Sequence, residues 1–528
     1  MKFGPKAAVL AAVTAATLAL AACGGGGAGN AGGNNGPAAS SLTIASVNDL
    51  KTFDPSDAHI GHTMPFYQAA YDSLILREPD GKLSPMLAQS WEYNADNTVL
   101  TLKLRTDVTF TDGAKFDAAA VKANLEHYKE AKGQDVYQVA SLKGVEVVDP
   151  ATVAITLTAP DPAFTYYLTQ AAGLMASPKA LGTPGIKTDP EGSGPYQLDT
   201  KNTVKGSQYV FTKRDGYWNK DLQKFDKITI KYLVDLTART NALVSGQVDA
   251  ALLDPKSGKQ AEGSGMVLHA SQVDWQGLLL MDRDGKITPE LANVKVRQAM
   301  NYAFDRKTIL DQQYLGQGTV TNQVFGPDSG AYVDSLDNRY PYDPAKAKAL
   351  MAEAGYPNGF TLKIPTVAAF DGINAVFKQQ LADIGITLVT ESIPPANLVA
   401  DIAGAKYSAA TFQLYQGEPW VAINQMVSTT ALYNAFKTET PELTALIKDV
   451  QAAGEKSGEA AKKVNEYITE NAWFVPMYRL NQMFYSNKKI DVQPQLQQAV
   501  PSIYNAPPPC WGGPGGGLCL PAPAPPHP

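Results

Sequence analysis

The stretch that most constrains the fold runs from residue 79 to residue 130, where short periodic segments alternate with turn signals. Apolar residues at every second position over 100–104 predict a half-buried strand, and the alternation returns at 108–110. Asp112-Gly113 predicts a turn, and Asp117 can cap a helix that follows it. A mixed α+β unit is expected here, with a further short helix over 83–91. Its expected core includes Trp91, Leu102 and Val121.

The rest of the chain predicts an α/β protein. Strands are expected at 42–47, 209–213, 361–364, 386–389 and 477–485, a hairpin at 144–157, and a parallel βαβ unit over 228–253. Helical patterns cover 164–174, 294–310, 344–354, 442–453 and 460–471. The helix expected from residue 344 has signals at both ends: Asp343 as N-cap, Pro344 at the first helical position and Gly355 just past the end.

Charge and composition exclude several classes of function. The chain has 528 residues, enough for two to four domains, and a net charge of −6 without basic clusters, which argues against a nucleic-acid partner. No hydrolase, metalloprotease or phosphate-loop motif occurs. Gly192-Ser193-Gly194-Pro195 lacks the helix and lysine of a phosphate loop. We therefore expect neither catalysis nor a cofactor.

The N-terminus reads as a lipoprotein signal. Lys2 and Lys6 precede an apolar run over 7–20, which is too short for a permanent membrane span. Leu20-Ala21-Ala22-Cys23 then fits a bacterial lipobox. We expect cleavage after residue 22, lipid attachment at Cys23, and a flexible Gly/Asn/Ala-rich tether over 23–41.

The other two cysteines, Cys510 and Cys519, lie in a Pro/Gly-rich tail over 506–528 that is expected to be disordered. They are compatible with a short-loop disulfide or with no role. Residues 24–509 contain no cysteine, which excludes a cysteine metal site or thiol nucleophile there. His59 and His62 would share one face of a helix, but no third ligand follows nearby, so polar residues near a cleft or surface are expected rather than a metal site.

The sequence of the 79–130 stretch resembles the signature of family 5 extracellular solute-binding proteins, the dipeptide, oligopeptide and nickel class that serves bacterial ABC importers. The matching residues are Asp80-Gly81, Leu83, Pro85, Leu87-Ala88, Ser90-Trp91, Leu104-Arg105, Val108, Phe110, Asp112-Gly113 and Val121. Later segments resemble the same family, among them GSGPY at 192–196, VRQAMNYAFDRKTI at 296–309 and YDPAKAKALMAEAGYPNGF at 342–360. The resemblance covers about residues 42–490, and the C-terminal tail departs from it.

The resemblance implies an α/β fold of the type II, class C periplasmic-binding-protein kind, with two lobes, hinge strands and an extra α+β subdomain. Lobe I would comprise 42–76, 191–275 and 479–505, the inserted subdomain 77–190, and lobe II 276–478. Hinge crossings are expected near Trp275 and Tyr478. The implied function is capture of a small solute by hinge closure and delivery to ABC permease subunits, by a monomer held on the outer face of the cytoplasmic membrane.

Ligand contacts are expected around 412–420, with Phe412, Tyr415, Glu418 and Trp420 as candidates beside Trp275 and Tyr478. Peptide-binding relatives carry an aspartate in this region that pairs with the ligand's ammonium group, and this chain has none. Glu418 is the candidate substitute, while Tyr415 and Trp420 fit a cleft wall as well as a ligand contact. Arg479 could pair with a carboxylate or be solvated.

Short peptides are the first expected ligand, with nickel complexes, sugars and opines left open. A lipoprotein hydrolase and a solute sensor with the same fold are the alternative functions.

Overall fold

The computed structural model describes residues 41–131 and 133–505. The predicted signal peptide, Cys23, nearly all of the predicted tether, and the tail with Cys510 and Cys519 lie outside these described residues. A nine-stranded sheet organises much of the chain, with β13 (Gly318–Val320) paired to one of its members. Its other strands, in spatial order, are β16 (Ala409–Tyr415), β12 (Val267–Leu280), β17 (Phe474–Ser486), β11 (Ala250–Leu253), β1 (Ser41–Ser46), β10 (Lys227–Tyr232), β9 (Gln208–Lys213) and β8 (Tyr196–Leu198).

The N-terminal strand lies between the two strands of the predicted βαβ unit. β10 and β11 each pair parallel with β1, and α4 (Leu236–Val244) connects them. The predicted parallel arrangement is confirmed, with β1 inserted between the two strands. Asp235 caps α4 by accepting a hydrogen bond from the Ala238 backbone. The next helix, α5 (Pro255–Gly263), follows β11 directly.

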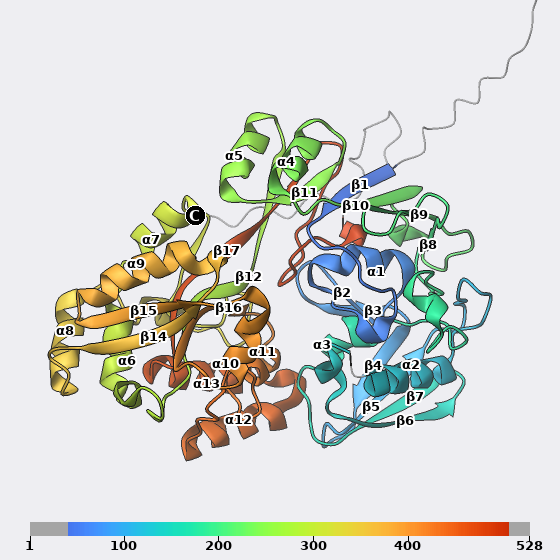
Figure 1. Ribbon diagram of the computed structural model, residues 1–528. Helices are drawn as coiled ribbons and strands as arrows, with labels where there is room; N and C mark the ends of the chain where they lie inside the picture. The colour runs from blue at the N-terminus through green and yellow to red at the C-terminus, as the bar shows by residue number, and fades with distance from the viewer. Residues whose placement is uncertain (1–40, 132, 506–528) are drawn as a thin grey trace, which may run out of the picture. The chain divides into compact units, whose positions relative to one another are not determined.

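Two long antiparallel strands, β12 and β17, run side by side (Figure 1). β17 pairs with β11 through residues 483–486, and β12 pairs with β16 through residues 274–280. The β12–β17 register shifts between Gln272 and Trp275 and again between Gln276 and Gly277. Such bulges bend a strand locally. Gly277 is required at this bend, because a Cβ atom there would lie 2.1 Å from the Val475 carbonyl oxygen.

The 79–130 stretch supplies two strands and the covering helix of a four-stranded antiparallel sheet, and residues 142–157 supply the other two strands. The strand order is β4 (Ala88–Tyr93), β5 (Val99–Leu104), β7 (Thr152–Leu157) and β6 (Leu142–Asp149), and α2 (Ala118–Ala131) packs beside it (Figure 1). Asp117 caps α2 as predicted, accepting from the Ala120 backbone. Leu102 and Val121 are fully buried, whereas Trp91 is half-buried against the same core.

The predicted helix over 83–91 is wrong. Residues Leu83–Pro85 form β3, which pairs with β2 (Ile75–Arg77), and β4 follows at once. Trp91 and Tyr93 turn toward the core while the residues between and before them stay exposed, which is the period of a strand. The predicted alternation at 108–110 makes only an isolated bridge between Thr109 and Lys115.

The long helix predicted over 294–310 is also wrong, because it divides into α6 (Val294–Tyr302) and α7 (Arg306–Tyr314). Asp305 accepts a hydrogen bond from the Thr308 backbone and so begins a new helix. The helix expected over 164–174 shortens to α3 (Phe164–Tyr167), followed by a separate 3₁₀ turn over Ala171–Gly173. The Asp305 cap decided the first of these boundaries.

The segment from 294 to 474 forms a second α/β assembly. β14 (Phe360–Thr366) and β15 (Ile386–Ser392) pair in parallel, with α9 (Asp371–Ala382) between them in the chain. The predicted α8 (Pro344–Glu353) is confirmed, with Asp343 as its cap. The remaining helices are α1 (Met64–Ala70), α10 (Leu398–Ala403), α11 (Pro419–Met426), α12 (Pro441–Ala453) and α13 (Gly458–Glu470). Within the described ranges, no helix is long and apolar enough to span a bilayer.

Candidate functional site

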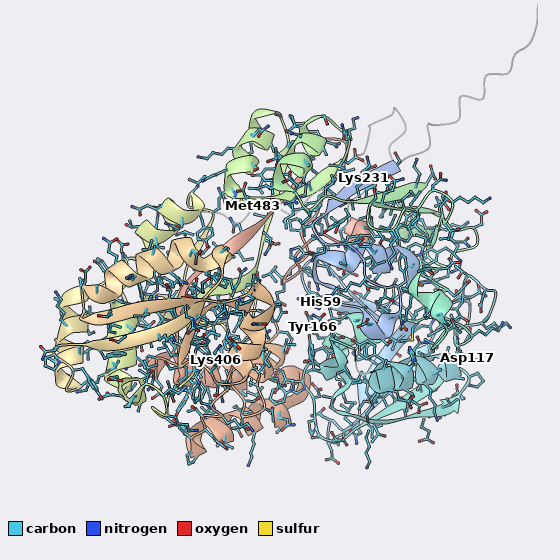
Figure 2. The ribbon with its side chains drawn as sticks, in the orientation of Figure 1. His59, Asp117, Tyr166, Lys231, Lys406 and Met483 are labelled. Carbon is cyan, nitrogen blue, oxygen red and sulfur yellow. The ribbon has the colours of Figure 1, made fainter. Side chains whose placement is uncertain are left out.

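A large cavity in the described part of the chain has a volume of about 890 Å³. One wall comes from residue 59 and residues 134–167, around β6, β7 and α3, and the other from residues 399–451, around α11 and α12. A volume of this size suits a small organic ligand, since ligand pockets commonly measure about 300–1,000 Å³. His59, labelled in Figure 2, is one of the lining residues.

Four large aromatic side chains line the cavity. Trp420 and Tyr433 contribute from the 399–451 side, and Tyr137 and Tyr167 from the other side. The Tyr137 and Tyr167 rings meet edge to face at 5.9 Å. Tyr137 is half exposed, whereas the other three are nearly buried. The cavity therefore combines aromatic surfaces with many polar groups, among them Gln134, Asn424 and Gln425.

Two carboxylates line the same cavity. Asp135 lies 3.1 Å from the His59 ring nitrogen Nδ1, and this hydrogen bond raises the pKa of His59 above its ordinary value. Asp161 is 9% exposed and accepts hydrogen bonds from the Ser141 hydroxyl at 2.7 Å and the Ala163 backbone at 3.1 Å. Burial raises the pKa of Asp161, and those hydrogen bonds oppose the rise. No basic side chain forms an ion pair with Asp161 among the described residues.

Several hydrogen bonds join the two walls beside the cavity. The Thr165 hydroxyl donates to Glu455 at 2.6 Å, and the Gln451 amide donates to the Pro160 carbonyl oxygen at 3.0 Å. The hydroxyl of Tyr166, labelled in Figure 2, lies 3.3 Å from the Tyr415 hydroxyl. Ala163 and Tyr167 also belong to the hydrophobic cluster of the 399–451 side. The structure thus shows the two walls in contact.

Of the six predicted ligand contacts, Trp420 lines the cavity. Glu418 caps α11, its carboxylate accepting from the Val421 backbone at 2.7 Å, and burial raises its pKa to about 7. Tyr415 donates to the Gln497 side chain at 3.1 Å and accepts from the Glu418 backbone. Phe412 lies between Phe370 and Tyr433, with its ring tilted against both.

The two predicted hinge residues have no exposed surface. Trp275 packs against Phe474 with ring centres 5.5 Å apart, and Tyr478 packs against Tyr314 at 5.2 Å. Arg479 is also fully buried, and its guanidinium donates to the Asp337 carboxylate at 3.0 and 3.2 Å. The carboxylate partner considered for Arg479 is therefore a residue of the same chain.

The two histidines of the predicted polar pair line different pockets. His59 contacts Asp135 at the large cavity, while His62 lines a separate small pocket beside β1. No group of three or more potential metal-ligating side chains occurs in residues 41–131 and 133–505. Asp161 and Tyr433 were missed from sequence because each lies in an irregular segment without periodicity. The turn signal Asp161-Pro162 after a predicted hairpin was the one available hint.

Comparisons with known proteins agree with this architecture. Residues 82–435 match the family described as "Bacterial extracellular solute-binding proteins, family 5 Middle". Glutathione-binding protein GsiB of Salmonella choleraesuis (strain SC-B67) is 31% identical over 466 residues, which cover 86% of this chain and 82% of that protein. GsiB of Escherichia coli O157:H7 is 30% identical over the same coverage.

Solved structures show the same fold. HbpA2 from Haemophilus parasuis superposes with a TM-score of 0.78 at 21% identity, covering 89% of this chain and 100% of that one. The periplasmic binding protein DppA from Helicobacter pylori, in complex with the peptide STSA, gives a TM-score of 0.73 at 21% identity and covers 89% and 98% of the two chains.

The chain belongs to the family 5 extracellular solute-binding proteins. It has the type II periplasmic-binding-protein fold and acts as the solute-binding component of an ABC importer, not as an enzyme.

Proposed function

We propose that the chain captures a short peptide in the 890 Å³ cavity by closure of its two walls and then delivers it to the permease. The single observation that carries this proposal is the cavity itself, which is lined from both sides and bridged by direct hydrogen bonds. Relatives described as binding glutathione, the peptide STSA and the dipeptide Met-Leu support a peptide ligand.

The proposed hinge lies where β12 and β17 pass between the two groups of strands. The register shifts at Trp275 and Gln276 place bends at the predicted crossing. We accordingly assign lobe I to 42–76, 191–275 and 479–505, the inserted subdomain to 77–190, and lobe II to 276–478. Closure by a few strand residues is a common way for two lobes to bury a ligand.

Lipid anchoring completes the proposal. Cleavage before Cys23 and acylation of its side chain would hold a monomer on the outer membrane face, with 23–41 as a tether. Metabolic labelling with an alkyne fatty acid tests this directly. Wild type should become labelled and Cys23→Ala should not. Equal labelling of the two proteins would refute the anchor without touching the binding proposal.

Native mass spectrometry of protein purified from its host tests the ligand. The expected result is a retained mass that fragments as a short peptide. Small-angle scattering of the protein stripped of ligand and then reloaded should show a decrease in radius of gyration on loading. A retained solute that contains no amino acid would overturn the peptide assignment.

A further inference from the structure

A short segment after β17, residues 495–498, is anchored to the start of the inserted subdomain. The Leu496 backbone N–H donates to the Pro79 carbonyl oxygen at 2.9 Å. The Gln495 side-chain amide donates to the Arg77 carbonyl oxygen at 3.0 Å. Because both bonds end on backbone oxygens next to each other in the chain, this segment is expected to stay with the inserted subdomain when the lobes move.

The side chain of Gln497 connects this segment to lobe II. Its Oε1 atom accepts hydrogen bonds from Arg77 Nη2 at 2.5 Å and from the Tyr415 hydroxyl at 3.1 Å. Its Nε2 atom donates to the Asp328 carbonyl oxygen at 3.1 Å. An arginine can only donate, so the amide oxygen has to face Arg77 and the amide nitrogen is left to face Asp328. One carboxamide, 8% exposed, thus joins the inserted subdomain to two segments of lobe II.

The backbone around this carboxamide is unusual in two places. Gln497 has a φ of 56°, in the left-handed region that is unfavourable for a residue with a side chain. A Cβ at Gly417 would lie 2.4 Å from Gln497 Cδ and 2.3 Å from the Tyr415 hydroxyl oxygen, so the contact needs a glycine on the lobe II side. Strained backbone of this kind persists where the surrounding contacts hold it, and it often marks a functional position.

The same contacts form a network that lies apart from the lining of the large cavity. The Tyr415 hydroxyl accepts from the Glu418 backbone N–H at 3.0 Å and lies 3.3 Å from the hydroxyl of Tyr166, which Figure 2 labels. The Arg77 guanidinium lies 5.0 Å from the centre of the Tyr166 ring. Arg77, Tyr415 and Gln497 are not among the residues that line the cavity. They therefore join the two sides without reaching a solute held there.

We propose that Gln497 is a closure latch, whose side chain holds lobe II against the inserted subdomain and raises the closed fraction of the solute-free protein. A solute that binds the closed form then binds more tightly, because its apparent Kd is the intrinsic Kd divided by the fraction of protein in the competent form. The latch strengthens the binding of every solute by the same factor and leaves selection to the cavity. The inference rests on the closure in the proposed function but not on the peptide assignment.

Gln497→Gly is the test variant, because glycine removes the carboxamide and fits the left-handed backbone without strain. Small-angle scattering of wild type and variant, both stripped of ligand, should show a larger radius of gyration for the variant. A pool of random tripeptides is the binding probe, with bound species identified by native mass spectrometry and affinities measured by calorimetry. The variant should bind the same tripeptides as wild type, each about 10-fold more weakly, because two neutral hydrogen bonds to lobe II are lost.

Gln493→Gly is the matched control, because Gln493 is an exposed glutamine four residues earlier in the same segment. It should behave as wild type in both measurements, and urea unfolding verifies that each protein is folded. Should Gln497→Gly not fold, Tyr415→Phe takes its place, since it removes the hydroxyl that donates to Gln497 from lobe II. That variant should shift the radius in the same direction by a smaller amount.

An unchanged radius of gyration in the folded test variant would overturn the latch. Binding of a different set of tripeptides by Gln497→Gly would overturn it as well, since Gln497 would then contact the solute. If neither wild type nor variant binds any tripeptide, the peptide assignment fails, while the scattering result still decides whether Gln497 is a latch.

Discussion

Removal of the carboxylate of Asp337 should destabilise the protein strongly, because it leaves Arg479 charged and buried. The Arg479 side chain is 0% exposed and the Asp337 side chain 18%. Two guanidinium N–H groups reach the carboxylate at 3.0 and 3.2 Å, and one also donates to the Phe325 carbonyl at 2.9 Å. Breaking a buried pair by removal of one partner costs about 3–5 kcal/mol. We expect Asp337→Ala to lose a free energy of unfolding of this size.

The matched control is the exposed pair of Arg339 and Glu470, whose side chains are 34% and 47% exposed. Its nitrogen and oxygen lie 2.5 Å apart, yet an exposed pair contributes only about 0–1 kcal/mol. Urea unfolding at pH 7 gives both free energies. The double variant Asp337→Ala, Arg479→Met should recover part of the loss of Asp337→Ala, because the unpaired charge is gone.

The effect should also depend on pH with a defined sign. Burial alone would raise the pKa of Asp337, but hydrogen bonds and the charge of Arg479 bring it below its ordinary value. The stabilisation is therefore present above the ordinary pKa of about 4 and is lost as the pH falls through the lowered folded value. Equal losses of unfolding free energy for Asp337→Ala and Glu470→Ala at pH 7 would refute the reasoning. So would a difference in unfolding free energy between wild type and Asp337→Ala that did not become smaller at low pH.

Three further predictions concern a tight turn, a buried acid and the closure contact. Gly194→Ala should lose about 1–3 kcal/mol of unfolding free energy, since its Cβ would lie 2.5 Å from backbone atoms, whereas Gly144→Ala, with no atom within 4 Å, should stay near wild type by urea unfolding. Glu418→Gln should be more stable than wild type at pH 8, and the difference should shrink toward pH 5. The reason is that the pKa of Glu418 in the folded protein, about 7, exceeds the ordinary 4.5, so wild type gains stability as Glu418 binds a proton between these two pH values. Thermal melts of both proteins from pH 8 to pH 5 would contradict this if the plots of melting temperature against pH stayed parallel. Thr165→Ala removes the hydrogen bond to Glu455 and should weaken binding of the retained solute about 2–10-fold by calorimetry, with unchanged affinity counting against closure at this contact.

The regular elements were largely predictable from the sequence because their signals are local. The caps Asp117 and Asp343 begin helices where expected, and the alternation over 100–104 forms β5. The two corrected segments failed for equally local reasons. In β4 the aromatic residues Trp91 and Tyr93 are two positions apart, which is the period of a strand and not of the predicted helix. Asp305 begins a new helix inside an otherwise continuous helical pattern.

The GSGPY turn shows how a motif can be recognised before its cause is known. Its resemblance to the family could be recognised from the sequence, but the requirement for glycine comes from tertiary contacts. A Cβ at Gly192 would lie 2.0 Å from the carbonyl oxygen of Ala70, and one at Gly194 would lie 2.5 Å from the carbonyl carbon of Ala70. Backbone from residue 70 occupies the space, so only glycine fits.

The sequence by itself determined the family, the α/β class and most helices and strands, because helix caps, hydrophobic periodicity and sequence motifs depend on residues that are close together in the chain. Only the tertiary structure decided the large cavity. It brings Asp161, from the segment after β7, and Trp420, from α11, to the same cavity, although the two are far apart in the chain. It also buries Trp275 and Arg479, which sequence reasoning had considered for the cleft. Burial and opposition across a cavity are set by packing between distant segments, and no local pattern encodes them.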